Sequence, residues 1–318
     1  MADSNNMSDL WKRLRFVLIG IIVYRIGTHI PIPGIDPQRL SSLFDQNQGT
    51  ILELFNLFSG GALERMSIFA LNVVPYISAA IIMQLFSNSI PYLIELKKDG
   101  QAGRNAITQY TRYGTVLLAF IQASALAVTL SSGGLAYNPG TAFFVSAVFS
   151  VVAGTIFLMW LGEQISERGI GNGISIIIAT SILTGIPSAI GQALEQARQG
   201  DLNILMLLSI GVLAMVVIAV VVFIERGQRR ITVNYAQRQQ GRKLMQAQAS
   251  HLPFKVNMAG VIPAIFASTF LLFPASLSTW FGQGENFGFL QSISLALNPG
   301  QPLYVLTFAA LIISFCFI

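Results

Sequence analysis

Histidines, a glycine-rich run and one cysteine are the residues of this chain whose types could do chemistry. His29 and His251 are its only histidines, and we predict below that they lie on opposite sides of a membrane, so they cannot share a metal ion or a catalytic dyad. Gly169-Ile170-Gly171-Asn172-Gly173 lacks the spacing of a dinucleotide-binding loop and instead predicts a tight turn with Asn172 as a helix cap. Cys316 is the single cysteine, which excludes an internal disulfide and a cysteine-based metal site. The pattern predicts neither an enzyme nor a cofactor.

Acidic residues do not predict a proton relay either. Glu163, Glu167 and Glu225 fall at the ends of apolar segments, and no carboxylate pair lies at membrane depth. An ion-coupled carrier usually keeps a charge in its core. An apolar core containing Ile77 and Ile265 would instead gate by dewetting, with little chemical selectivity. Branched aliphatic side chains can yield around a passing chain of any sequence, which favours a conduit for polypeptide over one for an ion.

The composition identifies the elements that must position such a pathway. Hydrophobic residues make up 53% of the 318 residues and charged residues 10%, whereas a soluble domain carries about 25% charged residues. The chain is therefore predicted to be an all-α, multi-pass membrane protein. Eight apolar segments can cross, some by borrowing flanking residues: 16–32, 68–90, 115–130, 142–161, 174–190, 202–224, 258–277 and 303–318.

Basic residues predict the orientation of these segments. With the segments in alternating directions, 15 of the 19 Lys and Arg residues fall on one side. The positive-inside rule then places the N-terminus in the cytoplasm. Arg25 is the only charge within a segment, and we expect its side chain to extend to the interface.

A short phrase occurs twice, at 73–79 (VVPYISA) and at 261–267 (VIPAIFA). Each copy carries a proline, Pro75 or Pro263, which we expect to interrupt a membrane helix. Because Val, Ile, Pro and Ala are common in such a chain, the repeat of this phrase could arise by chance. The copies lie five crossings apart, however, so their segments run in opposite directions, as an inverted repeat around a central pathway requires.

Two further stretches are irregular. Residues 50–58 are apolar but too short to span, and they end at Ser59-Gly60-Gly61. They predict either a small helix that closes a pathway from outside or an interfacial helix lying flat on the membrane. Loop 225–255 carries seven Lys or Arg residues against one acidic residue. Its alternation at 230–235 and a turn candidate at Gln239-Gln240-Gly241 predict a projecting hairpin. The hairpin would dock on RNA phosphates or an acidic protein, unless its charges only set the topology.

Several motifs together resemble the SecY family of protein-conducting channels. They are IPIPGI at 30–35, FSGG at 58–61, PYISA at 75–79, QYTRY at 109–113, GEQISERGIGNGIS at 162–175 and NMAGVIP at 257–263. The resemblance runs from Trp11 to the last residue and implies ten membrane helices in two inverted five-helix halves. This chain would hold the first half, 1–192, and an incomplete second half, 193–318, with the basic loop in it. Because the sequence stops within an apolar run, we expect it to be truncated.

The resemblance also implies site residues. The plug that seals the outer side matches Phe55, Asn56, Phe58, Ser59, Gly60 and Gly61. The pore ring matches Val73, Ile77, Ile174, Ile178 and Ile265. A polar cluster across the lateral gate matches Ser78, Gln122 and Asn257. The loop that contacts the ribosome and the motor ATPase SecA matches Arg229, Arg230, Arg238 and Arg242.

The function implied is a passive pore-forming subunit in the bacterial inner membrane. It would conduct unfolded secretory polypeptides and release membrane segments sideways into lipid. SecA or the ribosome would drive it, SecE and SecG would complete the hetero-oligomer, and signal peptides, nascent chains and lipids would contact it. No catalytic residue or metal is expected. The alternatives are a small-solute transporter, which should carry a mid-membrane charge, and a structural subunit without a pathway.

Overall fold

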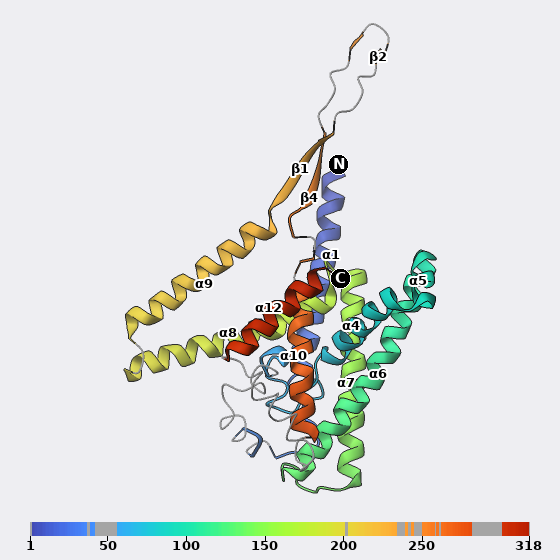
Figure 1. Cartoon of the computed structure of the whole chain (residues 1–318). Coiled ribbons are helices and arrows are strands. Elements are labelled where there is room, and N and C mark those ends of the chain that lie inside the picture. The colour runs from blue at the N-terminus through green and yellow to red at the C-terminus, as the bar shows by residue number, and fades with distance from the viewer. Residues whose placement is uncertain are drawn as a thin grey trace. The chain divides into compact units, whose positions relative to one another are not determined.

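The protein is mainly helical in a computed structural model, which describes residues 2–36, 39–41, 56–200, 203–233, 239–240, 243–244, 250–257, 259–260, 262–281 and 301–317. It divides into two compact units, Met1–Ser188 with Ala264–Ile318, and Ala189–Pro263. The predicted halves, 1–192 and 193–318, do not coincide with these units and remain a prediction. Figure 1 shows the helices and the two-stranded ribbon of the second unit.

Each predicted apolar segment overlaps one helix. These helices are α1 (Ala2–Gly27), α4 (Val74–Ser89), α6 (Gln101–Ser132), α7 (Thr141–Arg168), α8 (Gly173–Gln199), α9 (Ile204–Glu225), α10 (Ile262–Phe281) and α12 (Pro302–Cys316). Among the described residues, four helices are long and apolar enough to span by themselves, α6 to α9. The pair α4 and α5 (Pro91–Lys98) could make a fifth span, bent by 93° at its break. The membrane class predicted from composition is confirmed.

The two repeated prolines start helices, and the expectation that they interrupt them is wrong. Pro75 lies in the first turn of α4, and Pro263 is the second residue of α10. Proline is tolerated there because the first N–H groups of a helix have no intrahelical acceptor. The segment predicted from residue 68 therefore becomes helical only at Val74, and the residues before it form turns.

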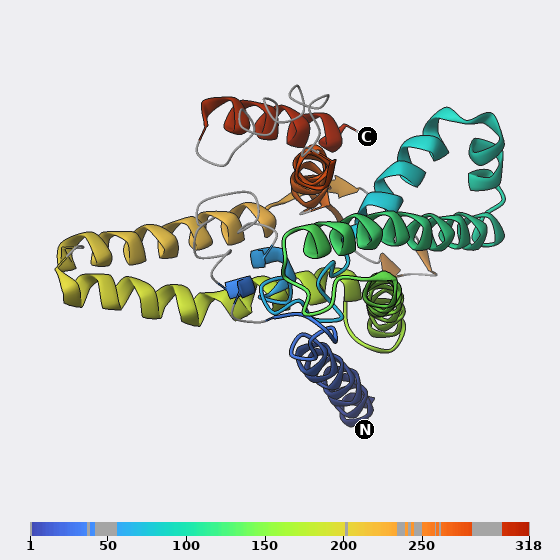
Figure 2. The same ribbon diagram turned by 90° about the horizontal axis from the view of Figure 1, so that it is seen from below.

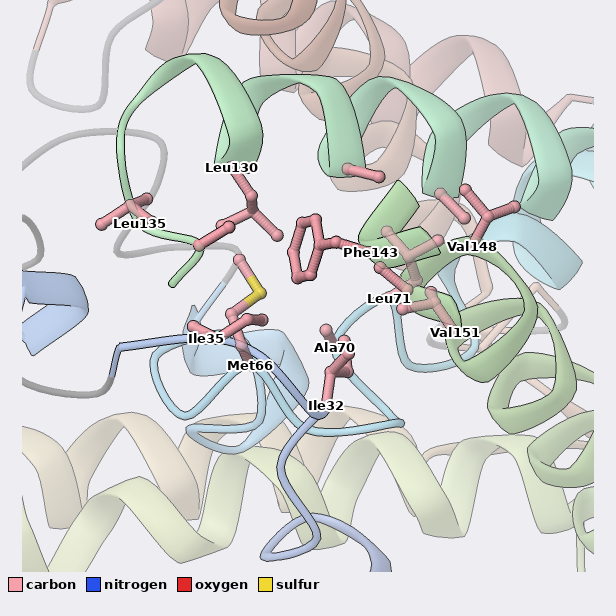
Figure 3. Close-up of a cluster of buried hydrophobic side chains, with 14 of the residues drawn as sticks. Ile32, Ile35, Met66, Ala70, Leu71, Leu130, Leu135, Phe143, Val148 and Val151 are labelled. Atoms are coloured by element: carbon pink, nitrogen blue, oxygen red, sulfur yellow. The ribbon is translucent and has the colours of Figure 1, made fainter. Parts of the chain in front are cut away.

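One apolar core lies between α6, α7 and the turns of 31–35 and 62–71 (Figure 3). On α6, Ala119, Ala123 and Ala127 follow each other at four-residue spacing and are all buried. They share one face of the helix, and their small side chains allow α7 to approach closely. Figure 2 shows α6 beside α7, with the bend between α4 and α5 near the N-terminal end of α6.

The GEQISERGIGNGIS motif forms a close turn between α7 and α8. Asn172 Oδ1 accepts hydrogen bonds from the backbone N of Ile174 at 3.0 Å and of Ser175 at 3.3 Å, which confirms the predicted cap. Ser166 Oγ accepts from the Gly173 N at 2.8 Å and donates to the Gly162 carbonyl at 2.9 Å. A Cβ on Gly173 would overlap the Gly162 carbonyl, so both glycines are needed for this approach.

The second unit contains α9 and the predicted hairpin. Strand β1 (Gln228–Val233) pairs antiparallel with β4 (Ser250–Lys255), and β2 (Gln239–Gln240) pairs with β3 (Lys243–Leu244). The alternating pattern predicted a strand at 230–235, which is confirmed for 230–233 in β1, and residues 234–235 lie outside the described part of the chain. The turn prediction was misplaced, because Gln239 and Gln240 are strand residues and the residues that connect β2 to β3 lie outside the described part of the chain.

Candidate functional site

The structure brings the five residues expected in a pore ring into one apolar cluster. Val73, Ile77 and Ile178 are members of one buried hydrophobic cluster, and Ile174 and Ile265 are partly buried against that larger cluster. Val73 and Ile77 lie one turn apart at the start of α4, and Ile174 and Ile178 lie one turn apart on α8, so each pair shares a helix face. Ile265 comes from α10. We call these five residues the aliphatic cluster.

The segment 56–61 packs against the larger buried hydrophobic cluster to which the aliphatic cluster belongs. Residues 56–59 form one helical turn, and Phe58 packs against the same group of buried side chains. Gly60 and Gly61 end the turn with φ of 66° and 78°, which glycine adopts readily. Ser59 and Gly60 are buried. Whether this segment closes a pathway or lies flat on the membrane remains a prediction. Phe55 lies outside the described residues.

Three successive carbonyls at the end of this turn are held by side chains. Asn72 Nδ2 donates to the Phe58 carbonyl at 2.6 Å, and the Tyr24 hydroxyl donates to the Ser59 carbonyl at 3.1 Å. Arg25 Nη1 donates to the Gly60 carbonyl at 3.3 Å. The last carbonyls of a helix have no intrahelical partner, so these side chains satisfy them. Arg25 is half-buried, and the expectation that its side chain extends to the membrane interface remains a prediction.

A hydroxyl on α8 connects two of these side chains. Ser181 Oγ lies 2.6 Å from the Tyr24 hydroxyl and accepts from Asn72 Nδ2 at 3.1 Å. Tyr24, Asn72 and Ser181 are buried, and the sequence analysis missed all three. The available signal was weak: each is a polar residue in an otherwise apolar stretch.

Two of the three expected lateral-gate residues lie on neighbouring helices. Ser78 is half-buried on α4, and Gln122 is buried on α6, which packs against α4. Asn257 belongs to the second unit, where its Nδ2 donates to Glu225 Oε1 at 3.3 Å and to the Gly260 carbonyl at 3.4 Å. Their assembly into one cluster remains a prediction.

The ribbon of β1 and β4 has two different faces. Arg229 pairs with Phe254 and Ile231 with Leu252, so these four residues share one face. Arg230 alternates to the opposite face. Arg229 and Arg230 are both exposed, and so are the three apolar side chains of the first face. Arg238 and Arg242 lie outside the described residues.

The histidines lie apart from this site. His29 is exposed, with Nδ1 2.9 Å from the Arg25 carbonyl and Nε2 3.3 Å from Arg65 Nη1. His251 is exposed on β4. In the described ranges, no group of three or more His, Cys, Asp or Glu residues is arranged to hold a metal ion.

Comparison with known proteins identifies the relatives of this chain. A family model described as SecY matches residues 67–318. The protein translocase subunit SecY of Pseudomonas aeruginosa is 62% identical over 315 residues, which are 99% of this chain and 71% of that protein. The subunit of the same name from Escherichia coli K12 is 59% identical over 320 residues, 99% of this chain and 72% of that protein.

Solved channel structures share the fold. A structure described as a protein-conducting channel matches with a TM-score of 0.66 at 20% identity, over 96% of this chain and 71% of that one. Sec61 in the canine ribosome-channel complex matches with a TM-score of 0.59 at 20% identity, over 85% of this chain and 60% of that one. On the extent of the family-model match and the identity to the curated relatives, the chain belongs to the SecY family.

Proposed function

We propose that this chain is the pore-forming subunit of a protein translocon, a passive channel for unfolded polypeptides in the bacterial inner membrane. Relatives at about 60% identity carry the name of a protein translocase subunit. The chain's own contribution is a pathway, and the energy for transport comes from partners. The small-solute transporter is not favoured, because the relatives carry the name of a protein translocase subunit and the solved structures that share the fold are protein-conducting channels.

The observation that carries the proposal is that Phe58 and the five residues of the aliphatic cluster all join one buried hydrophobic cluster. The aliphatic cluster draws on α4, α8 and α10, three elements far apart in the sequence. Aliphatic side chains exclude water without binding any particular solute, which suits a constriction that closes around a chain of variable sequence. The segment 56–61 then acts as the plug, on the outer side of the cluster under the predicted orientation.

Partner contacts follow from the remaining surfaces. The helices α4, α6 and α10 form the lateral gate, with Ser78, Gln122 and Asn257 as its polar residues. The basic loop 225–255, which carries Arg229, Arg230, Arg238 and Arg242, docks the ribosome or SecA from the cytoplasm. SecE and SecG complete the complex. The N-terminus is cytoplasmic, because the positive-inside rule applied to the loops requires it.

Site-specific crosslinking tests this function. In full-length protein assembled with its partners, a cysteine at Ile77 or Ile265 should crosslink to a stalled secretory chain that carries one cysteine. A matched control is Phe149→Cys on α7, whose side chain is 66% exposed and outside the aliphatic cluster. Crosslinks at the control with none at either cluster position would remove these residues from the pathway.

A further inference from the structure

Tyr24, Asn72 and Ser181 form a buried hydrogen-bonded group that no expected role in the channel uses. We propose that these three residues are a polar latch, which holds the segment 56–61 closed over the aliphatic cluster and sets how readily the resting channel opens. The proposal rests on the plug role of this segment given above. The three residues are positioning residues. They act on the segment 56–61 and not on the polypeptide that is transported.

The latch holds the segment through two hydrogen bonds to its backbone carbonyls. Its donors reach the Phe58 carbonyl from Asn72 at 2.6 Å and the Ser59 carbonyl from Tyr24 at 3.1 Å. The two donors lie on different elements, α1 and the turns before α4. Ser181 Oγ on α8 bonds to both of them. The latch therefore fixes the segment to three parts of the wall at once.

Close packing restricts the segment to this position. A Cβ on Gly60 would lie 3.1 Å from Ser181 Cα, and one on Gly185 would lie 3.1 Å from Leu57 Cδ1. The segment thus rests on α8 without room for a methyl group at Gly60. Asn72 adopts φ of 49°, a left-handed conformation that asparagine tolerates better than most residues.

The hydroxyl groups make the latch reversible. Ser181 Oγ also lies 2.9 Å from the Ile177 carbonyl of its own helix. The hydroxyl groups of Tyr24 and Ser181 have two hydrogens between them. Three hydrogen-bond positions are available to these hydrogens: at the Ser59 carbonyl, between the two hydroxyl groups, and at the Ile177 carbonyl. When the segment leaves, the Tyr24 hydrogen can turn to Ser181 Oγ and the Ser181 hydrogen to Ile177. Both hydroxyl donors then keep acceptors, whereas Asn72 Nδ2 loses the Phe58 carbonyl and keeps only Ser181 Oγ, so the desolvation cost of release falls mainly on Asn72.

Ionic conductance of the resting channel tests the latch. The full-length channel complex is placed in planar bilayers without polypeptide substrate. Tyr24→Phe removes one hydroxyl group, and Asn72→Gly removes one amide at a position whose φ suits glycine. Each should raise the open probability about 3- to 10-fold, the equilibrium change expected for the net contribution of one buried hydrogen bond.

A matched control removes a buried hydroxyl elsewhere. Thr155 Oγ1 on α7 donates only to its own helix, at 3.0 Å from the Val151 carbonyl, so Thr155→Val should leave the conductance unchanged. Unchanged conductance in both latch variants, or an equal rise in the control, would overturn the latch.

A disulfide provides the positional readout. In a background without other cysteines, Leu57→Cys and Gly185→Cys are added to Tyr24→Phe. Once gel mobility shows that the pair is oxidised, the conductance should return to the wild-type level, and a leak that persists would overturn the proposal. Crosslinking at Ile77 and Ile265 reports separately on the pathway. If Ile77 or Ile265 crosslinks to the stalled chain but the latch variants leave the conductance unchanged, the latch alone is refuted. If neither position crosslinks, the proposed channel function is refuted.

Discussion

A methyl group at Gly173 should separate α7 from α8. The Cβ of an alanine there would lie 2.8 Å from Ile165 Cβ and would also overlap the Gly162 carbonyl. Carbon atoms in contact prefer about 3.5–4.0 Å, so α8 must withdraw by roughly 1 Å. Overpacking of this kind costs about 1–3 kcal/mol. Restricting the unfolded chain returns about 0.4–1 kcal/mol, so the middle of these two ranges leaves a net loss of about 1.3 kcal/mol.

Thermal unfolding of the channel complex in detergent, at one fixed scan rate, measures this loss. About 2–4 °C per kcal/mol is typical for a domain of 150–250 residues, so Gly173→Ala should lower the Tm by about 3–5 °C. Gly191→Ala on the same helix is the matched control, because no atom lies within 4 Å of the added Cβ. Its Tm should stay constant or rise, since alanine favours a helix interior over glycine. A Tm for Gly173→Ala equal to that of the control would refute the close-approach argument.

Three other predictions concern the cap, an ion pair and the ribbon. Asn172→Ala should cost about 0.5–2 kcal/mol through loss of the cap, whereas Asn172→Asp should keep most of it; equal Tm losses would exclude capping. Arg112 binds Glu163 through Nε at 2.8 Å and Nη2 at 2.9 Å. Because Arg112 is 44% exposed, Arg112→Gln should cost only about 0.5 kcal/mol and less in high salt, and a salt-independent loss would contradict an electrostatic origin. Arg229→Glu and Arg230→Glu should weaken binding of the ribosome or SecA unequally, and more at low salt; equal effects would argue against two distinct ribbon faces.

The positions of the membrane helices were predictable because they depend on composition over long stretches. Apolar runs located every helix that can span, and alternation located β1. Local chemistry also predicted the Asn172 cap, since a cap involves only residues within one turn. The repeated prolines were misinterpreted. A proline is compatible with the first turn of a helix and incompatible with its interior, and the sequence alone did not distinguish these positions for Pro75 and Pro263.

The contacts around the segment 56–61 could not be predicted from the sequence. Tyr24 and Ser181 are 157 positions apart, and no local pattern joins them. Asn72 and Arg25 are polar residues near apolar runs, which predicts only that each needs a partner. The identity of that partner depends on how α1 and α8 pack. The bend of 93° after α4 was missed for a related reason, because Pro91 permits a break but does not fix its angle.

The short connection between α7 and α8 has a consequence for biogenesis. Four residues, Gly169 to Asn172, join the two helices. Under the predicted orientation this link lies on the cytoplasmic side, so α7 and α8 cross in opposite directions with little slack between them. Arg168 then anchors both helices together, and a change of charge there would affect the topology of two spans instead of one.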